Sequence, residues 1–260
     1  LILARYNYTL EQLAMYGDVS YDLTDRIELG AGARWFNIDR DFSSDVTGLL
    51  GGDPFESGAA SETGLTPRFS LNYALSDEVT LYASAAEGYR AGGVNNGEGG
   101  GLAECLVELA DLGYDGFPTS YDSDSLWSYD LGAKTRWQGG RTQLNIVGYH
   151  IDWSDMQTTK LLNCGTYFVQ NAGKASSNGA EVEFYTRPTD RLTLNLAAQI
   201  SDAEMEEDVP SLDAQAGDRL PGTPKFSASA VVSYDFIAFG RDAYIDGSYL
   251  YVGESYDVFD

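Results

Sequence analysis

Only a few side chains in this sequence have the type and spacing that chemistry needs. His150 is the only histidine, and Asp152 follows it by two positions. Residues two apart on a β-strand share a face, so these two side chains could act as an acid–base pair. A lone histidine on a polar face is more often inert. An acidic run could bind a cation weakly, although such runs are more often solvated loop tips; it comprises Glu204, Glu206, Glu207 and Asp208. We therefore expect no catalytic, cofactor-binding or metal site.

The sequence contains two cysteines, Cys105 and Cys164. Two thiols are too few for a four-thiolate zinc site, but they can form one disulfide in an oxidising compartment. Each falls in a polar segment, 92–121 or 161–166, and these segments are successive loops on the same side of the strand pattern described below. A disulfide is the preferred interpretation. Two free thiols are the alternative, and metal ligation is least favoured because no histidine lies nearby.

A glycine-rich segment follows a tyrosine and an arginine. Four polar side chains in this segment or directly before it could contact a ligand: Tyr89, Arg90, Asn95 and Asn96. The alternative is structural, because Gly88, Gly92 and Gly93 would let a strand end and turn through positive φ. We favour the structural interpretation.

Period-two alternation predicts the elements that would position these residues. In 26–35, for example, Ile27, Leu29 and Trp35 alternate with polar or small residues, which is typical of a two-faced strand. Ten strands are predicted, at 8–23, 26–40, 64–75, 79–91, 122–137, 141–160, 167–187, 191–204, 221–235 and 241–255.

Short turns and long polar loops alternate along the chain, which indicates an antiparallel up-and-down meander. Many of the strands reach the ~9–11 residues that a tilted strand needs to cross a bilayer. In hydrocarbon, strands pair all their backbone groups only in a closed barrel. We therefore expect an all-β transmembrane β-barrel segment. A soluble sandwich or propeller is the alternative, but the sequence shows no blade-length repeat.

The polar face of these strands would line the barrel lumen, and His150 is expected there too. Charged side chains on this face could contact a plug or guide a substrate, or could simply be solvated. The candidates are Arg34, Arg68, Asp130, Lys134, Arg136, Glu181 and Glu183.

Composition excludes two classes of protein. No segment approaches the ~18 consecutive apolar residues of a membrane-spanning helix, so a helical membrane protein is excluded. The formal charge of −24, from 40 acidic and 16 basic residues, argues against nucleic acid as a partner, because phosphate binding depends on Lys and Arg.

Four stretches carry a family resemblance: 20–29 (SYDLTDRIEL), 81–95 (LYASAAEGYRAGGVN), 129–134 (YDLGAK) and 171–175 (NAGKA). In this order they resemble segments of the TonB-dependent receptors, with Asp130 where that family usually has Glu. The resemblance covers about residues 10–255 and is made specific by the order of the stretches.

The resemblance implies about ten strands of a 22-stranded barrel in the outer membrane of a Gram-negative bacterium. We expect residues 1–260 to be a partial barrel domain of a longer chain, without the plug, the TonB box and the first and last strands. The implied partners are outer-membrane lipid, the protein's own plug, the TonB complex and a small nutrient such as a ferric siderophore. A complete ten-stranded barrel enzyme, similar to the omptin proteases and using His150, is one alternative. A passive porin is another.

Overall fold

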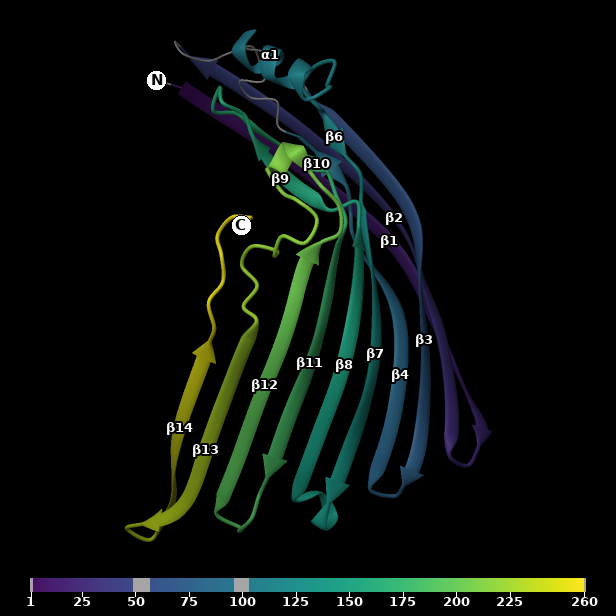
Figure 1. The fold of residues 1–260 in the computed structure, drawn as a ribbon, viewed down its shortest axis with the longest axis vertical. Helices are drawn as coiled ribbons and strands as arrows, with labels where there is room; N and C mark the ends of the chain where they lie inside the picture. Colours follow the sequence, from purple (N-terminus) through teal and green to yellow (C-terminus); the bar gives the residue numbers. More distant parts are fainter. Residues whose placement is uncertain (1, 49–56, 96–102, 260) are drawn as a thin grey trace.

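The computed structural model describes residues 2–48, 57–95 and 103–259, and in these residues the largest sheet has ten strands (Figure 1). Each strand pairs antiparallel with the next along this order, which confirms the up-and-down meander. The strands are β1 (Ile2–Thr24), β2 (Ile27–Gly48), β3 (Gly58–Ser76), β4 (Val79–Arg90), β7 (Asp124–Trp137), β8 (Thr142–Ser154), β11 (Ala175–Thr186), β12 (Leu192–Met205), β13 (Phe226–Ala238) and β14 (Arg241–Val252).

Tight turns connect these strands at one end of the sheet, at the bottom of Figure 1. The Thr24 hydroxyl accepts hydrogen bonds from the backbone N–H groups of Arg26 and Ile27, which closes the first turn. At the last turn, Phe239 and Gly240 both have positive φ, as a two-residue hairpin turn with the right-handed strand twist requires. Longer connections lie at the opposite end, so the predicted alternation of turns and loops is confirmed.

The pairing register gives the sheet one apolar face. Leu29 lies opposite Tyr21 and Leu71, and Leu131 lies opposite Ala83. Large apolar side chains on this face are exposed, among them Leu29, Phe69, Leu71, Leu131, Ile146, Val182, Leu196 and Ile200. An exposed apolar surface that extends across a whole sheet is rare in soluble monomers and indicates contact with lipid or protein.

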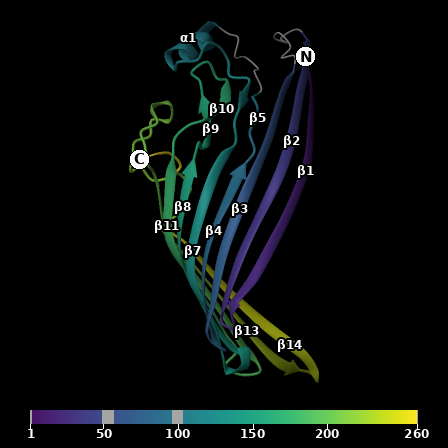
Figure 2. The same cartoon turned by 90° about the vertical axis from the view of Figure 1, so that its right-hand side faces the viewer.

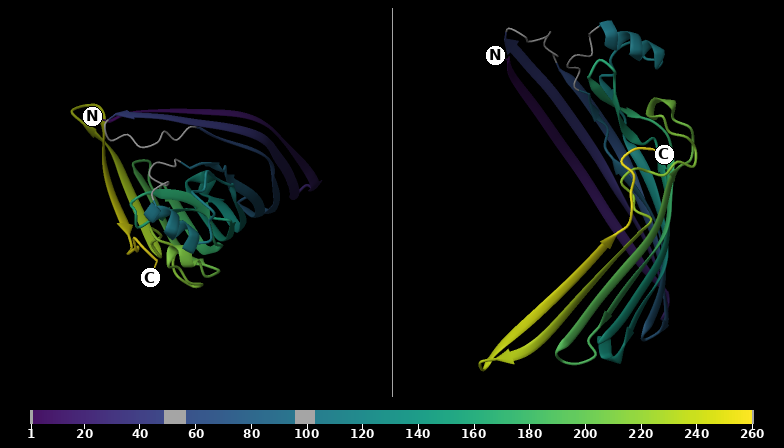
Figure 3. Two further views of the ribbon diagram at one scale, coloured as in Figure 1. Left: turned by 90° about the horizontal axis from the view of Figure 1, so that it is seen from above. Right: turned by 60° about the vertical axis from the view of Figure 1, so that its left-hand side comes forward.

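The other face is concave and polar. The short strands β5 (Gly93–Val94) and β6 (Ser120–Tyr121) lie against it at the loop ends of β2 and β3, with the Val94 side chain directly above Gly58. Seen from above, the loop elements lie inside the curve of the sheet (Figure 3, left). The apolar face is therefore the convex one.

Two predicted strands are each broken near the loop end. Predicted strand 141–160 becomes β8 and a separate β9 (Gln157–Leu161), and predicted strand 167–187 becomes β10 (Tyr167–Asn171) and β11. The breaks occur where Asp155 and Gly173 adopt left-handed backbone conformations, with φ of 55° and 82°. As a result the β9–β10 hairpin leaves the ten-stranded sheet, which we call the wall, and lies over its concave side (Figure 2).

Other differences concern the loops. Predicted loop 92–121 contains β5, β6 and the helix α1 (Ala103–Asp111), and predicted loop 41–64 is shortened because β2 and β3 extend into it. Predicted strand 221–235 begins later, at Phe226. Two short 3-10 helices complete the elements, η1 (Gln138–Gly140) and η2 (Pro210–Leu212). In the described part of the chain, no helix has the length and apolarity to cross a membrane.

Candidate functional site

All seven predicted lumenal charges lie on the concave face. Cross-strand pairing places Asp130 opposite Ser84, Glu183 opposite Asn145, and Arg68 opposite Gly32. By the same alternation, this face also carries Arg34, Lys134, Arg136 and Glu181. Several of the seven have partners on the face: Arg68 with Asp18 at 2.9 Å, Asp130 with Ser84 at 2.8 Å, Glu183 with Asn145 at 3.3 Å, and Lys134 over the Tyr82 ring at 5.1 Å. Charged and polar side chains are thus spread over the concave face.

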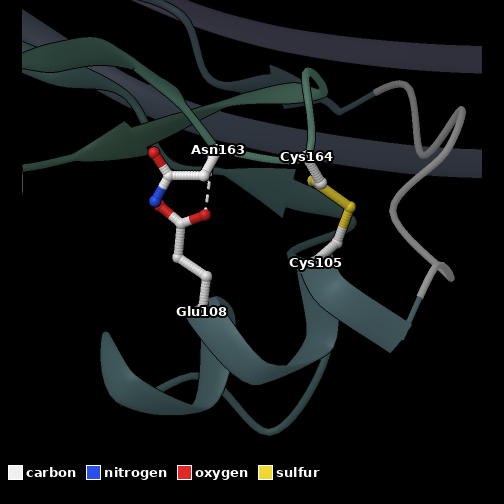
Figure 4. The surroundings of a disulfide bond; sticks show 4 residues. All are labelled: Cys105, Glu108, Asn163 and Cys164. Atoms are coloured by element: carbon white, nitrogen blue, oxygen red, sulfur yellow. Dashed lines mark hydrogen bonds between the residues drawn. A yellow bond between two sulfur atoms is a disulfide. The ribbon is translucent and has the colours of Figure 1, made fainter.

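A compact loop module covers the loop end of the concave face. We define it as residues 91–95, 103–123 and 155–174. A disulfide joins Cys105 on α1 to Cys164 in the β9–β10 turn, with the Cα atoms 5.5 Å apart (Figure 4). Beside it, the Glu108 carboxylate accepts a hydrogen bond of 2.7 Å from the Asn163 backbone N–H. The disulfide that was favoured from the sequence is therefore present in the structure.

The module has its own apolar core. The buried side chains of Cys105, Leu109, Leu162 and Phe168 form its centre. The rings of Tyr114 and Phe117 pack edge-on against Phe168, at centroid distances of 5.3 and 5.8 Å. Burial raises the pKa of the Tyr114 phenol, and its hydroxyl donates to Gln170 Oε1 at 2.8 Å.

Side-chain amides connect the two halves of the module, which are residues 91–95 with 103–123 and residues 155–174. Asn95 acts like an added strand residue: it donates to the Val169 carbonyl at 2.8 Å and accepts from the Val169 N–H at 2.7 Å. Asn171 bonds the backbone of Asp122 in the same two-way manner. The Gln157 amide donates to the carbonyl oxygens of Arg90, Ala91 and Asp122. The loops therefore form one hydrogen-bonded unit.

One buried carboxylate fastens this unit to the wall. Asp124 is 2% exposed and accepts hydrogen bonds from the Arg90 guanidinium, from Trp153 Nε1 at 3.0 Å and from the Gln157 N–H at 3.1 Å. The Arg90 guanidinium also lies 4.8 Å above the Trp153 ring. Asp124 therefore joins the ends of β4, β7 and β8 to the start of β9.

The surroundings of Asp124 favour the ionised form of its carboxyl group. It begins the 14-residue strand β7 at the end opposite the short turn, beyond the ~9–11 residues that would cross a bilayer. Burial opposes its ionisation, but hydrogen bonds from Arg90, Gln157 and Trp153 and the charge of Arg90 outweigh burial and lower the pKa of the carboxyl.

The predicted ligand-contacting residues have different environments. Arg90 and Asn95 are engaged in the contacts just described, and Asn95 is 3% exposed. Tyr89 stacks face to face on Phe36, with centroids 3.8 Å apart and planes 4° apart. Asn96 lies outside the described residues.

The glycines near residue 90 do not have the backbone conformation that the sequence predicted. Gly88, Gly92 and Gly93 are not among the glycines with positive φ. At Gly92 the backbone comes so close to β6 that an added Cβ would lie 2.5 Å from the Tyr121 carbonyl oxygen. The segment therefore needs glycine at position 92 for close approach and not for a turn.

A pocket of about 310 Å³ lies between the loop module and the wall. Its lining includes Arg40, Ala60 and Glu62 from β2 and β3, and Gly92, Tyr121 and Asp122 from the module. The sequence analysis did not select Arg40. Alternation places Arg40 on the same face as Arg34, but the predicted strand ended at this residue, so no neighbours were defined for it.

The two chemical candidates from the sequence do not form a site. His150 Nε2 lies 2.8 Å from Asp152 and Nδ1 lies 2.8 Å from Asn178. The register, however, places His150 opposite Tyr129, on the face of Leu131 and Ile146. The expected lumenal position of His150 was therefore wrong, because the side chain lies on the convex face. Within residues 2–48, 57–95 and 103–259, no cluster of three His, Cys, Asp or Glu side chains could hold a metal ion, so the acidic run at 204–208 forms none.

Comparison with known proteins gives consistent matches. Residues 3–260 match the family model described as TonB dependent receptor-like, beta-barrel. The pesticin receptor of Yersinia enterocolitica is 28% identical over 226 residues, which cover 86% of this chain. The metal-pseudopaline receptor CntO of Pseudomonas aeruginosa is 26% identical over 192 residues, 74% of this chain. The chain spans 30% and 23% of the lengths of these two relatives.

Solved structures agree on the fold. The ferric yersiniabactin uptake receptor FyuA from Yersinia pestis superposes with a TM-score of 0.71 at 22% identity, over 93% of this chain and 34% of FyuA. The ferric-catecholate import receptor Fiu from E. coli K12, in its closed form, gives 0.63 at 17% identity, over 88% of this chain and 32% of Fiu.

Proposed function

The chain belongs to the TonB-dependent receptor family, and from this premise we propose that it forms part of the transmembrane barrel of an outer-membrane receptor that imports a scarce nutrient, such as a ferric siderophore, in a TonB-dependent step. The whole receptor's ligand and partners belong to the proposal. The names of the relatives support it, since FyuA takes up ferric yersiniabactin and CntO is a metal-pseudopaline receptor.

The observation that carries the proposal is the contrast between the two faces of the sheet. The convex face is apolar and exposed, as a lipid-facing surface must be, and the concave face carries charged and polar side chains on the central strand pairs. The strands contain 12 to 23 residues, enough to cross a bilayer and continue beyond it. The loop module then stands at the outer end of the lumen.

In this proposal the ten strands are one part of a larger closed barrel. β1 and β14 end the sheet order in the described residues, and unpaired strand edges are unfavourable in hydrocarbon. Further strands of the complete receptor, up to the 22 of the family, would pair with these edges. A plug would contact the polar concave face, where Arg34, Arg136 and Glu181 project.

Catalysis is not part of the proposal. The omptin-like alternative required His150 in the lumen beside a carboxylate, and His150 lies on the convex face instead. No observation favours a passive porin over a receptor.

The test is uptake by the complete receptor in its own Gram-negative host. A strain with the receptor gene deleted, and the same strain with the gene restored, receive radiolabelled iron as ferric citrate, a ferric hydroxamate or a ferric catecholate. We expect restored uptake of at least one chelate, abolished by a protonophore or by loss of TonB. Uptake that is independent of TonB would favour a porin, and no receptor-dependent uptake of any chelate would overturn the proposal.

A further inference from the structure

Arg40 combines two features in the described structure: its guanidinium has no ion pair, and its Nε atom is buried without a hydrogen-bond partner. Among the described residues, Arg68, Arg90 and Arg141 form ion pairs with Asp18, Asp124 and Asp190. Arg40 forms none, although the chain has 40 acidic residues against 16 basic ones. Its Nε atom is buried and has no hydrogen-bond partner.

A buried donor without a partner is unfavourable and needs an explanation. Arg219 also has an unpartnered Nε, but its guanidinium donates to the Thr223 carbonyl at 2.9 Å and lies 5.2 Å from the Tyr256 ring. Arg40 has no comparable bond within the described residues. The Nε atom itself is out of reach of solvent, so the Nη groups are the donors that an external acceptor would meet.

The position of Arg40 makes such an acceptor accessible. Arg40 lines the pocket of about 310 Å³ on the concave face, where β5 lies against the ends of β2 and β3 (Figure 2). The backbone at Gly93 approaches the guanidinium so closely that an added Cβ would lie 3.1 Å from Nη1. The loop module thus covers Arg40 on one side and leaves the pocket on the other.

The acidic neighbour of Arg40 is already engaged. Glu62 lines the same pocket, and its carboxylate accepts a hydrogen bond of 3.1 Å from the Gly92 N–H. It forms no ion pair with Arg40 within 4 Å in the described structure. Glu62 therefore holds the module in place and does not neutralise Arg40.

We infer that Arg40 and its pocket form the subsite that binds a carboxylate carried by the imported metal chelate. A guanidinium matches the planar carboxylate with two parallel hydrogen bonds, and a partly desolvated pair of this kind is strong. The inference rests on the proposed function and adds the chemical class of the ligand.

The lining of the pocket narrows that class. Ligand pockets start at ~300 Å³, so this pocket holds one arm of a chelate and not the entire complex. Glu62 and Asp122 also line it, and their negative charge disfavours a doubly charged group such as a phosphate monoester in this subsite. A single carboxylate, on a ligand whose hydroxyl or amine groups reach Glu62, satisfies both charges.

The experiment measures binding of ferric citrate and of a neutral ferric hydroxamate to the complete receptor in detergent, and uptake of both in cells. The variants are Arg40→Gln, Arg40→Lys and the control Arg26→Gln, which removes an exposed arginine at the short-turn end of the sheet. Arg40→Gln removes no hydrogen bond of the described chain, so the receptor should fold and reach the membrane at the wild-type level. We expect affinity for ferric citrate to fall by roughly ten- to hundredfold in Arg40→Gln, with partial retention in Arg40→Lys and no change in Arg26→Gln.

A second variant predicts a change of opposite sign. Glu62→Gln keeps an oxygen that accepts the Gly92 N–H but removes the negative charge, so affinity for ferric citrate should rise. Wild-type binding of ferric citrate that Arg40→Gln leaves unchanged would overturn the inference alone, as would wild-type uptake confined to the hydroxamate. Absence of receptor-dependent uptake of either chelate, and of the catecholate, would overturn the proposed function and the inference with it.

Discussion

The wall and the loop module achieve stability in different ways. The wall exposes large apolar side chains on its convex face. Its stability therefore comes from the hydrogen bonds between paired strands and from the apolar surroundings that the convex face requires. Most of the fully buried large side chains lie in the loop module or against it, including Phe168, Leu109, Leu162 and Asp124. The module therefore resembles a small domain with a core, a disulfide and a charged anchor, attached to one end of the sheet. The two regions should therefore respond to different perturbations.

The largest effect on the module is expected from Asp124→Ala. The substitution leaves the Arg90 guanidinium, the Trp153 indole N–H and the Gln157 N–H without their common acceptor. Each buried donor left without an acceptor costs about 1–3 kcal/mol, although the Arg90 side chain, which is 50% exposed, is partly compensated by solvent. Hydrogen exchange of the complete receptor should show faster exchange in 155–174 and unchanged exchange in β12 and β13. Equal acceleration in the wall would contradict the separation of the two regions.

Asp190→Ala is the matched control for that change. It also removes a carboxylate that pairs with an arginine, Arg141, at 2.7 Å, but the Asp190 side chain is 86% exposed. An exposed pair contributes little to stability. Its loss should leave exchange in both regions unchanged.

Reduction of the disulfide should be the next largest effect. The bond joins residues 59 positions apart, and loop closure of that size corresponds to at most about 4 kcal/mol. Because Asn95 and Asn171 still connect the halves of the module, reduction should loosen α1 and the β9–β10 turn while β9 stays attached at Gln157. Limited proteolysis with and without reductant measures this. The double variant Cys105→Ser, Cys164→Ser should be cleaved equally in both conditions, and cleavage within β11 or β12 would contradict the local effect.

The convex face can be perturbed without the module. Leu131 is 69% exposed and lies in the middle of β7. A charge at the bilayer centre of a barrel costs about 2–4 kcal/mol, so Leu131→Arg should destabilise the wall in urea unfolding from lipid vesicles. Asn145→Arg, on the concave face of the neighbouring strand, is the control and should have little effect. Equal effects of the two substitutions would mean that the faces have been assigned incorrectly.

The same contrast explains what the sequence could predict. The wall was predictable because two-residue alternation is repeated over strands such as β2 and β7. Since paired residues of neighbouring strands share a face, the apolar side of one strand also indicates the apolar side of the next. Near the loops, the predicted strands 141–160 and 167–187 run through Asp155 and Gly173, where the chain in fact leaves the wall. Local pattern does not distinguish a strand in the wall from a strand that folds over it.

The site residues on the wall could likewise be predicted from the sequence, whereas those at the loop module could not. The concave charges, such as Arg68 and Asp130, were predicted by alternation alone. Arg40, Asp124 and Asn95 acquire their roles from contacts between segments far apart in sequence, such as Asn95 with Val169. His150 was assigned to the wrong face because the alternation of 142–153 is weak, and only the pairing with Tyr129 fixes its direction.

The smallest expected effect is the response of the module to acid. Burial opposes the ionisation of Asp124, but the hydrogen bonds from Arg90, Gln157 and Trp153 prevail and lower its pKa below the unfolded value of about 3.9. A lowered folded-state pKa means that this stabilisation is complete above the unfolded pKa and is lost as pH falls through the folded pKa. Hydrogen exchange in 155–174, corrected for the intrinsic effect of pH, should therefore be constant from neutral pH to about pH 4 and accelerate below it. Asp124→Asn has no carboxyl to titrate, so its corrected exchange should not change over the same range; parallel acceleration in that variant would assign the acid response to another group.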